Sequence, residues 1–240
     1  MTAMSASDDH WPKDLVVLIP VYNHGSTVGA VVAAARAAGA VVLVVDDGST
    51  DLSAAAARAA GAEVLSLAVN RGKGAALAHG LAEASSRGFT RALACDADGQ
   101  HPPEAVIALM RAARAEPTAL WLGVRRMGGA PRASRIGRWW CNVGTWLACG
   151  VWPRDNQTGL RIYPLPAMSV LPIRARRYAY EVESTIRAVW AGVPLRTCEV
   201  AVLYPVDRIS HFQGWRDSLR GVATCLRLMV ARPFARGLRS

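Results

Sequence analysis

The feature that most constrains the fold of this chain is a repeated unit: a short apolar run, a polar loop, and then a stretch with helical character. The apolar runs are typical of strands that are buried on both faces of a sheet. They occupy residues 15–19, 41–45, 63–67 and 91–95. Helices are expected in the intervals, the first of them capped by Ser26 or Thr27. This alternation predicts an α/β fold with a mostly parallel sheet flanked by helices.

Each predicted strand ends in a cluster of polar residues. The clusters are Tyr22-Asn23, Asp46-Asp47, 70–74 and 96–100. The carboxyl ends of parallel strands share one sheet edge, where open α/β sheets bind their ligands. Asp, Gly and Pro after a strand can also form an ordinary surface turn. Because four clusters meet at one edge, we favour a nucleotide or sugar-nucleotide site.

The last cluster, Asp96-Ala97-Asp98-Gly99-Gln100, places two carboxylates one residue apart. Hard oxygen ligands without an enclosing cage suit Mg²⁺ or Mn²⁺ that is shared with a substrate diphosphate. Other nucleotide motifs do not match. Residues 20–25 contain no G-x-G-x-x-G, and Lys73 is followed by Gly74 rather than by Ser or Thr, which excludes a Walker loop. The amides of Gly72 to Gly74 can still bind a phosphate at a helix start.

Together and in this order, the motifs resemble those of glycosyltransferase family 2, whose catalytic domain has the Rossmann-like GT-A fold. They lie at 19–23, 45–51, 70–74 and 96–104. The last is especially similar to the branch of dolichol-phosphate mannose synthases and polyprenyl-phosphate glycosyltransferases. The likeness continues at 123–125, 155–161 and 181–183. It covers residues 14–210, approximately.

The resemblance implies a donor site. Pro20 and Tyr22 would pack against the base, and Asp47 would hydrogen-bond the base edge or the ribose. The implied donor-binding set is Pro20, Tyr22, Asn23, Asp46, Asp47, Lys73, Asp96 and Ala97. The implied ligands of Mg²⁺ or Mn²⁺ are Asp96, Asp98 and Gln100. Such an ion neutralises charge on the departing nucleoside diphosphate, and transfer in this family inverts the anomeric centre.

On the acceptor side, Arg125 and Arg135 match the arginines that hold the lipid phosphate in the polyprenyl-phosphate branch. A guanidinium fork binds phosphate bidentately, although a solvated arginine-rich helix face is the simpler alternative. The implied acceptor set is Arg125, Arg135, Thr158, Gly159 and Arg161; the implied catalytic set is Asp98, Asp155, Arg125 and Arg135. A phosphate acceptor needs no general base. Glu181 and Glu183 could be bases or structural partners of arginines.

The predicted activity is metal-dependent, inverting transfer of a hexose from a nucleoside-diphosphate sugar to a polyprenyl (dolichyl or undecaprenyl) phosphate or similar lipid. A hydroxyl of another lipid or small molecule stays open as acceptor. A non-enzymatic basic module that binds nucleotide or nucleic acid is the rival from another class. Because the arginines are not interleaved with stacking aromatics of an RNA-binding motif, we expect no nucleic-acid partner. A hydrolase would need a nucleophile elbow, which is absent from the sequence.

The net charge of +10 is unevenly distributed, which indicates an anionic partner. Six arginines and no acids lie in 125–154, and seven arginines with Asp217 lie in 208–240. A basic amphipathic helix is predicted at 215–231, with an apolar stripe of Leu219, Val222, Leu226, Met229 and Val230. It could lie on an anionic membrane or pack on the domain. Likewise Trp139, Trp140 and Trp146 could face lipid or fill core.

Three segments are expected: a disordered polar leader (1–14), the catalytic domain (15–207) and a basic amphipathic C-terminal extension (208–240). A hydrophobic content of 52% excludes global disorder. No apolar run reaches the ~18 residues of a membrane span, and residues 1–14 do not resemble a signal peptide. We therefore expect a cytoplasmic protein, with peripheral attachment to the inner face of the membrane left open. The five scattered cysteines should be mostly buried thiols.

Overall fold

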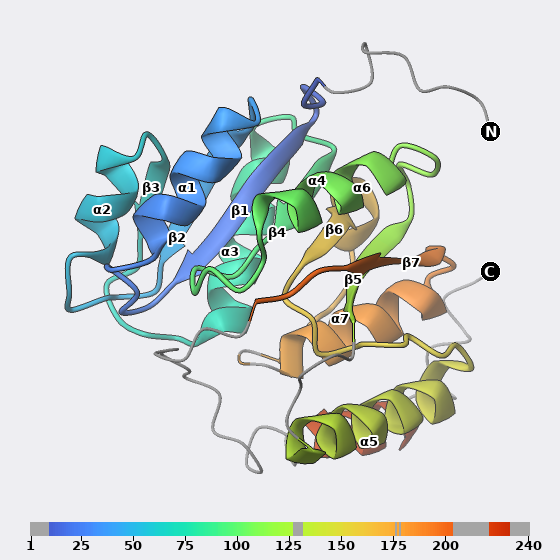
Figure 1. Ribbon diagram of the computed structural model, residues 1–240. Helices are drawn as coiled ribbons and strands as arrows, with labels where there is room; N and C mark the ends of the chain where they lie inside the picture. The colour runs from blue at the N-terminus through green and yellow to red at the C-terminus, as the bar shows by residue number, and fades with distance from the viewer. Residues whose placement is uncertain (1–9, 127–131, 176, 178, 204–220, 231–240) are drawn as a thin grey trace.

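A seven-stranded sheet forms the centre of the computed structural model (Figure 1), with the strand order β3-β2-β1-β4-β6-β5-β7. The structure describes residues 10–126, 132–175, 177, 179–203 and 221–230. The strands are β1 (Leu15–Val21), β2 (Val41–Asp46), β3 (Glu63–Ser66), β4 (Arg91–Ala94), β5 (Leu120–Arg125), β6 (Arg161–Pro164) and β7 (Leu195–Val200). Neighbouring strands are parallel except that β6 runs antiparallel to both β4 and β5.

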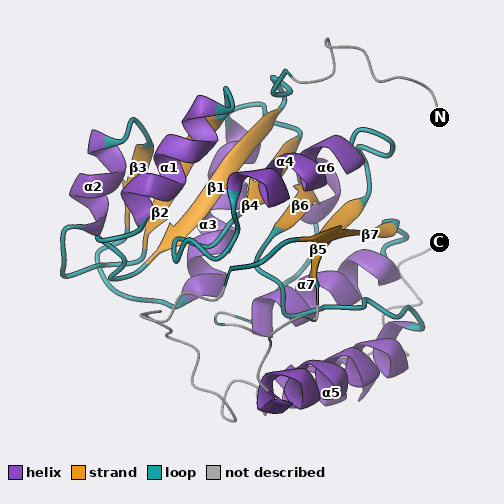
Figure 2. Ribbon diagram, in the orientation of Figure 1, coloured by secondary structure: helices purple, strands orange, loops and turns teal. Residues whose placement is uncertain are grey.

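Helices cover both faces of the sheet (Figure 2). They are α1 (Val28–Ala37), α2 (Ser53–Ala59), α3 (Lys73–Ser86), α4 (Pro103–Ala112), α5 (Arg132–Cys149), α6 (Leu165–Met168) and α7 (Ala179–Trp190). Alternating strand side chains point to opposite faces. Val17 and Ile19 join a core with α1, α2 and α4, whereas Val16 and Leu18 join a second core with α3, α6 and α7. The prediction of an α/β fold with a mostly parallel sheet is confirmed.

The antiparallel strand β6 was not anticipated, and it decides which loops meet. Since β6 starts where its neighbours β4 and β5 end, the turn before it lies at their carboxyl edge. The segment 155–160 therefore joins the ends of β1, β2 and β4 at one edge of the sheet.

Part of the expected leader, residues 10–14, packs on the domain. Residues 1–9 of the expected leader lie outside the described part, but Trp11 is 7% exposed and packs into the core. Its indole Nε1 donates to the carbonyl of Leu15 at 2.7 Å. Asp14 accepts hydrogen bonds from Arg91 Nε and Nη2 at 2.9 and 2.8 Å. The domain therefore includes residues before Leu15, because a buried indole and an ion pair hold them.

The C-terminal extension contains a helix at 221–230, and the rest of 208–240 lies outside the described residues. Cys225 and Leu228 are buried in a small core with α5 and α7. This helix packs on the domain through Cys225 and Leu228, which lie outside the predicted stripe. Of the stripe itself, Met229 packs against the same core, whereas Leu226 and Val230 are exposed. Trp139, Trp140 and Trp146 are also exposed and do not fill the core. No helix in the described part is long and apolar enough to cross a membrane.

Candidate functional site

The loops after β1, β2 and β4 are tied together by short polar contacts. The amide of Asn23 donates to Ser49 Oγ at 3.0 Å, and Asn23 Oδ1 accepts from the amide of Thr50 at 2.9 Å. Thr27 Oγ1 donates to the carbonyl of Ala97 at 2.7 Å. Asn23 has a φ of 53°, a left-handed conformation that asparagine tolerates better than most residues. These bonds fix the spacing between the loops at the carboxyl edge.

Asp47 holds the next loop of this series. Its two carboxylate oxygens accept hydrogen bonds from the amides of Arg71 and Gly72 at 2.8 and 2.7 Å. Burial raises the pKa of Asp47, although these amide bonds act in the opposite direction. Beside it, Gly48 has a φ of 73°, and an added Cβ there would meet the Asn70 nitrogen at 2.8 Å. In this structure the Asp47 carboxylate positions the loop in front of α3.

Lys73, the first residue of α3, joins two carboxylates from distant parts of the chain. Its Nζ lies 2.7 Å from Asp96 Oδ1 and 2.8 Å from Glu181 Oε1 at the start of α7. Burial acts against the charged amine, but attraction to Asp96 and Glu181 outweighs it and raises the pKa of Lys73. Glu181 is only 2% exposed. The cation thus links the loop after β4 to the start of α7.

Asp96 and Asp98 place two carboxylates beside one another, as predicted from their spacing. Burial opposes ionisation of Asp96, but the charge of Lys73 lowers its pKa. Burial, followed by repulsion from Asp96, raises the pKa of Asp98. The amide and the side-chain amide of Gln100 both donate to the Asp98 carboxylate. His101 lies near both carboxylates, whose charges act on its pKa, and it is 8% exposed. Its Nδ1 has no hydrogen-bond partner among the described residues.

These residues fit a divalent cation. A cation stabilises the charged form of a carboxylate that is destabilised by burial and by a neighbouring carboxylate. The oxygens of Asp96, Asp98 and Gln100 are hard ligands, which suit such an ion. The described residues bring no three His, Cys, Asp or Glu side chains together as a closed metal site. An ion held here would therefore complete its coordination with oxygens of a diphosphate.

On the acceptor side, Asp155 is fully buried and is held by arginines. Arg125, at the end of β5, donates from Nε and Nη2 to its two carboxylate oxygens at 2.7 and 2.9 Å. Arg138 of α5 approaches the same carboxylate at 3.5 Å. Although burial opposes ionisation, Arg125 and Arg138 lower the pKa of Asp155. The guanidinium fork expected to bind an acceptor phosphate is thus engaged by a carboxylate.

Arg161 has a structural role in this arrangement. It is fully buried, and its guanidinium donates to the carbonyls of Thr158, Glu181 and Asn156 at 2.8, 2.9 and 2.7 Å. It also donates to Thr185 Oγ1 at 3.0 Å. These bonds shape the turn before β6 from inside, and they leave the guanidinium without access to an acceptor. This differs from the acceptor contact expected for Arg161.

Gly159 brings the turn before β6 close to the loop after β4. A Cβ added at Gly159 would collide with the carboxylate of Asp96. Only glycine therefore allows the backbone of this turn to lie so close to Asp96. The two halves of the predicted site meet at this contact.

The other predicted residues differ in where they lie. Pro20 is within β1, paired with Val45, and Tyr22 follows at the carboxyl edge. Asp46 accepts from the amide of Ser49 at 3.0 Å. Thr158 is fully buried, whereas Arg135 is exposed on α5 and is not among the residues that contact Asp155.

Sequence reasoning assigned no role to Arg138 or His101, and it left the role of Glu183 open between a base and a structural partner. Helical spacing was a usable signal for Arg138, because a residue three positions after Arg135 lies on the same side of a helix. Glu183 is fully buried and accepts from Arg187 Nε, Arg227 Nη2 and the amide of Ala175 at 2.7, 2.7 and 2.9 Å. This supports the alternative in which Glu183 is a partner of arginines.

The sequence is similar to one known protein family and to several known proteins. The profile of "Glycosyl transferase family 2" matches residues 16–163. An uncharacterized protein of Methanocaldococcus jannaschii is 29% identical over 199 residues, 80% of this chain and 82% of that protein. The undecaprenyl-phosphate mannosyltransferase of Micrococcus luteus is 28% identical over 205 residues, 79% of this chain and 83% of that enzyme.

Among solved structures, the fold is similar to that of glucosyl-3-phosphoglycerate synthase from Mycobacterium tuberculosis in complex with phosphoglyceric acid. The TM-score is 0.70 at 21% identity, over 90% of this chain and 79% of that chain. Another structure of that synthase, with a TM-score of 0.68 at 21% identity over the same shares of the two chains, contains Mn²⁺, UDP-glucose and phosphoglyceric acid. The loops, the paired aspartates and the family match agree: this chain belongs to glycosyltransferase family 2 and is a glycosyltransferase enzyme.

Proposed function

We propose that this enzyme transfers a hexose from a nucleoside-diphosphate sugar to a polyprenyl phosphate or a similar lipid phosphate, with inversion at the anomeric carbon. Support for the acceptor class comes from the similarity to an undecaprenyl-phosphate mannosyltransferase, which extends over 79% of this chain. Support for the donor comes from the four loops at the carboxyl edge and from the family itself.

The observation that carries the acceptor proposal is that the acceptor-side carboxylates are already paired with cations. Asp155 is held by Arg125 and has a lowered pKa, and Glu183 is held by Arg187 and Arg227. A carboxylate stabilised in its charged form is a weak general base. A hydroxyl acceptor needs a base to take its proton, whereas a phosphate acceptor arrives ionised. This arrangement favours a phosphate nucleophile.

On the donor side, Asp96, Asp98 and Gln100 would hold Mg²⁺ or Mn²⁺. Such an ion supplies charge neutralisation to the departing diphosphate. Lys73 lies 2.7 Å from Asp96 and adds a second positive charge at the N-terminus of α3. Tyr22 and Pro20 would contact the base, with Asn23 and Asp46 shaping the loops around it.

The test is a transfer assay with matched acceptors. The purified protein is incubated with Mn²⁺, a panel of nucleoside-diphosphate hexoses, and one of three acceptors: undecaprenyl phosphate, undecaprenol or 3-phosphoglycerate. Mass spectrometry of the products is expected to show a hexosyl lipid phosphate with the first acceptor alone. Undecaprenol is the matched control, because it has the same chain without the phosphate.

A product with undecaprenol would show that a hydroxyl is the nucleophile and would overturn the acceptor proposal. A product with 3-phosphoglycerate alone would assign a water-soluble acceptor instead. Chelation of the metal should abolish transfer in each case, and transfer that persists in excess chelator would overturn the metal-dependent mechanism.

A further inference from the structure

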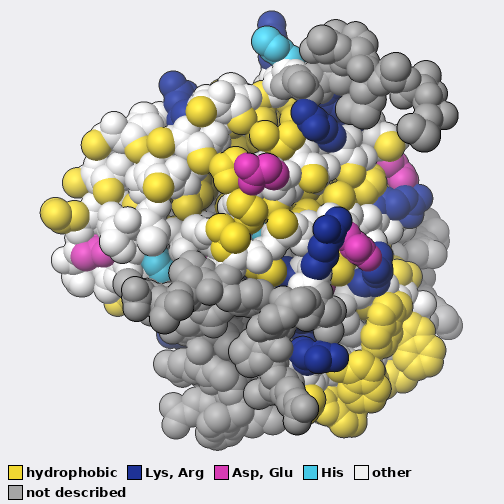
Figure 3. All heavy atoms as spheres, viewed as in Figure 1, with side chains coloured by type: hydrophobic (Ala, Val, Ile, Leu, Met, Phe, Trp, Pro, Cys, Tyr) yellow, Lys and Arg dark blue, Asp and Glu magenta, His cyan; other side chains and the backbone are white. Residues whose placement is uncertain are grey.

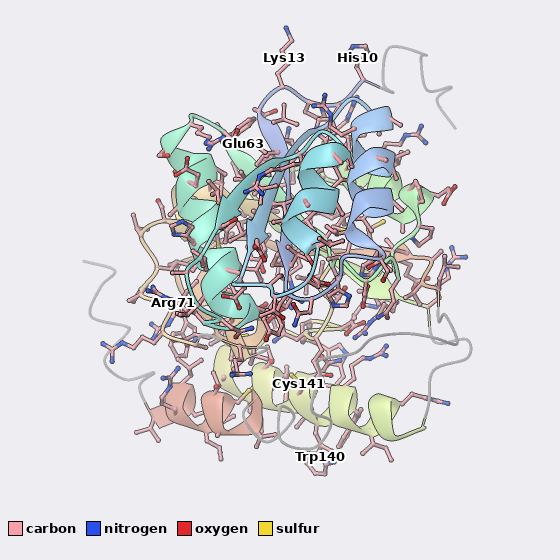
Figure 4. The ribbon with its side chains drawn as sticks, turned by 90° about the vertical axis from the view of Figure 1, so that its left-hand side faces the viewer. His10, Lys13, Glu63, Arg71, Trp140 and Cys141 are labelled. Carbon is pink, nitrogen blue, oxygen red and sulfur yellow. The ribbon has the colours of Figure 1, made fainter. Side chains whose placement is uncertain are left out.

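The outer face of α5 is unusually apolar. Its exposed side chains include Ile136, Trp139, Trp140, Trp146 and Leu147, with exposed fractions of 59, 52, 56, 48 and 51%. Figure 4 shows Trp140 pointing away from the sheet, while its neighbour Cys141 points toward the domain. Large apolar side chains at these positions recur at helical spacing and so form one continuous face.

The inner face of the same helix contains buried polar side chains besides the small apolar Cys141 and Ala148. Arg138, Asn142 and Thr145 are all buried. Asn142 Nδ2 donates to the carbonyl of Arg154 at 2.7 Å, and Thr145 Oγ1 accepts from Asn156 Nδ2 at 2.8 Å. A helix on a water-exposed surface normally has the opposite arrangement, with apolar residues inward and polar residues outward. The large apolar side chains of α5 thus point outward while three polar ones are buried, which is expected of a helix that faces lipid or a partner.

The apolar exposure is concentrated in this part of the molecule. In Figure 3, hydrophobic side chains gather at the lower right, in the region of α5. The turn after α5 adds Val151 and Trp152, which are 36 and 44% exposed. The helix at 221–230, beside α5 in Figure 4, adds Leu226 and Val230 at 57 and 77%. A concentration of exposed apolar side chains of this kind marks an interaction site.

The charge and the residue types of this exposed surface indicate what binds to it. Residues 117–154 contain six arginines and no acid, and Arg135 is exposed on α5 beside the apolar side chains. Tryptophan and arginine are the residues that favour the boundary between lipid headgroups and acyl chains. A basic, tryptophan-rich face suits an anionic lipid surface through both apolar burial and attraction to headgroups.

We propose that the outer face of α5, which we call the aromatic face (Ile136, Trp139, Trp140, Trp146 and Leu147), docks on an anionic phospholipid bilayer. The inner face of α5 touches Asp155 and the carbonyl of Arg154, so the acceptor turn lies one helix diameter, about 10 Å, from this surface. The proposal thus gives the acceptor side direct access to a membrane, but binding itself requires no turnover.

The test measures binding of the full chain to vesicles without donor or acceptor. Flotation is compared for equimolar phosphatidylglycerol–phosphatidylcholine vesicles and for pure phosphatidylcholine vesicles. Wild-type protein should float with the anionic vesicles and less with the neutral ones. The double variant Trp139→Ala/Trp140→Ala should bind at least about tenfold more weakly, because inserting one large side chain into lipid is worth about a factor of ten or more.

Val170→Ala is the matched control, since Val170 is 78% exposed and follows α6, away from the aromatic face. It should bind like wild type. In vesicles with brominated acyl chains, wild-type tryptophan fluorescence should be quenched, and the double variant should lose most of that quenching. Both variants must keep the wild-type melting temperature.

Wild-type protein that fails to bind anionic vesicles would overturn the proposal, as would a double variant that binds normally. A dimer in sedimentation that the double variant converts to monomer would assign the aromatic face to a second copy of the chain. Because no sugar transfer is measured, failure here leaves the proposed function intact. Conversely, vesicle binding without transfer would overturn the proposed function alone.

Discussion

The donor half and the acceptor half of the site are built by different kinds of contact. The donor half consists of the loops after β1 to β4, which are joined largely by backbone amides and short side chains such as Asn23, Thr27 and Asp47. The acceptor half consists of the end of β5, α5, the turn before β6 and the start of α7. It is joined by buried arginine–carboxylate contacts such as Arg125–Asp155. The loops of the donor half are joined mainly by hydrogen bonds that involve backbone groups, with Lys73 as a charged link to Glu181, whereas the acceptor half is joined mainly by buried charge pairs.

Two aspartates show what this difference means for function. Burial and repulsion from Asp96 raise the pKa of Asp98, so this carboxylate gains from the arrival of a cation. Arg125 and Arg138 overcome the effect of burial and lower the pKa of Asp155, so this carboxylate already has its cations. The carboxylates of the donor half therefore suit the proposed metal, while the carboxylate of Asp155 in the acceptor half holds arginines in place.

The largest expected effect is loss of turnover in Asp98→Asn. The variant removes a charged ligand of the proposed metal site, and we expect transfer to fall by about 10³-fold, on the scale of lost charge stabilisation at a transition state. Urea unfolding of the metal-free protein should show no loss of stability, since removing Asp98 relieves repulsion with Asp96. A variant that keeps full activity would remove Asp98 from the metal site.

The next effect is on stability and concerns Asp155→Asn. Removing this carboxylate leaves Arg125 and Arg138 without their shared counter-charge, which should lower the free energy of unfolding by about 3–5 kcal/mol. Because the pKa of Asp155 is lowered, its contribution is present above the ordinary aspartate pKa of about 4 and is lost as the pH falls below it. Chemical denaturation at pH 7 and pH 3 should show the difference from wild type shrinking.

A smaller loss should follow Asp47→Asn, which weakens two hydrogen bonds from backbone amides. We expect a loss of about 1–3 kcal/mol in the free energy of unfolding. The ratio of the losses in free energy of unfolding for Asp47→Asn and Asp155→Asn tests the comparison between the two halves of the site. If Asp47→Asn destabilised the protein as much as Asp155→Asn, the distinction between an amide-bonded half and a charge-paired half would be wrong.

The smallest effect should come from Asp14→Asn, far from the site at the start of β1. Arg91 holds the pKa of Asp14 at about 2. The side chain of Asp14 is 42% exposed, so solvent screening reduces the pair to about 1 kcal/mol. Its contribution is present above about pH 4 and is lost as the pH falls toward 2. Transfer activity at pH 7 should be unchanged, and a loss of activity would argue against a purely structural pair.

The sequence was most informative for the donor half, and the reason is geometric. Residues 20–23, 46–47, 70–74 and 96–100 each follow their strand directly, so their placement follows from the parallel order of β1 to β4. Hydrophobic periodicity predicts those strands well. The role of Asp47 was less accessible, because its bonds to the amides of Arg71 and Gly72 depend on the conformation of another loop.

The acceptor half was less accessible because its contacts depend on the antiparallel strand β6 and on burial, neither of which follows from motif spacing. Arg125 and Asp155 are 30 residues apart and meet only because β6 runs antiparallel. Arg161 matches a family motif, but burial, which no motif reports, decides that its guanidinium bonds to carbonyls. On α5, the family motif predicted a role for Arg135, whereas in the structure it is Arg138, three residues later, that lies against Asp155.

The close approach of Gly159 to Asp96 has a thermodynamic consequence. Asp96 is a proposed metal ligand, so a backbone packed this closely against it could not move without changing the coordination that Asp96 would offer. An acceptor that shifts the turn at 155–159 would therefore alter the affinity for the metal–nucleotide complex. By linkage, the metal–nucleotide complex would alter acceptor affinity by the same factor. One glycine would make the binding of the two substrates cooperative.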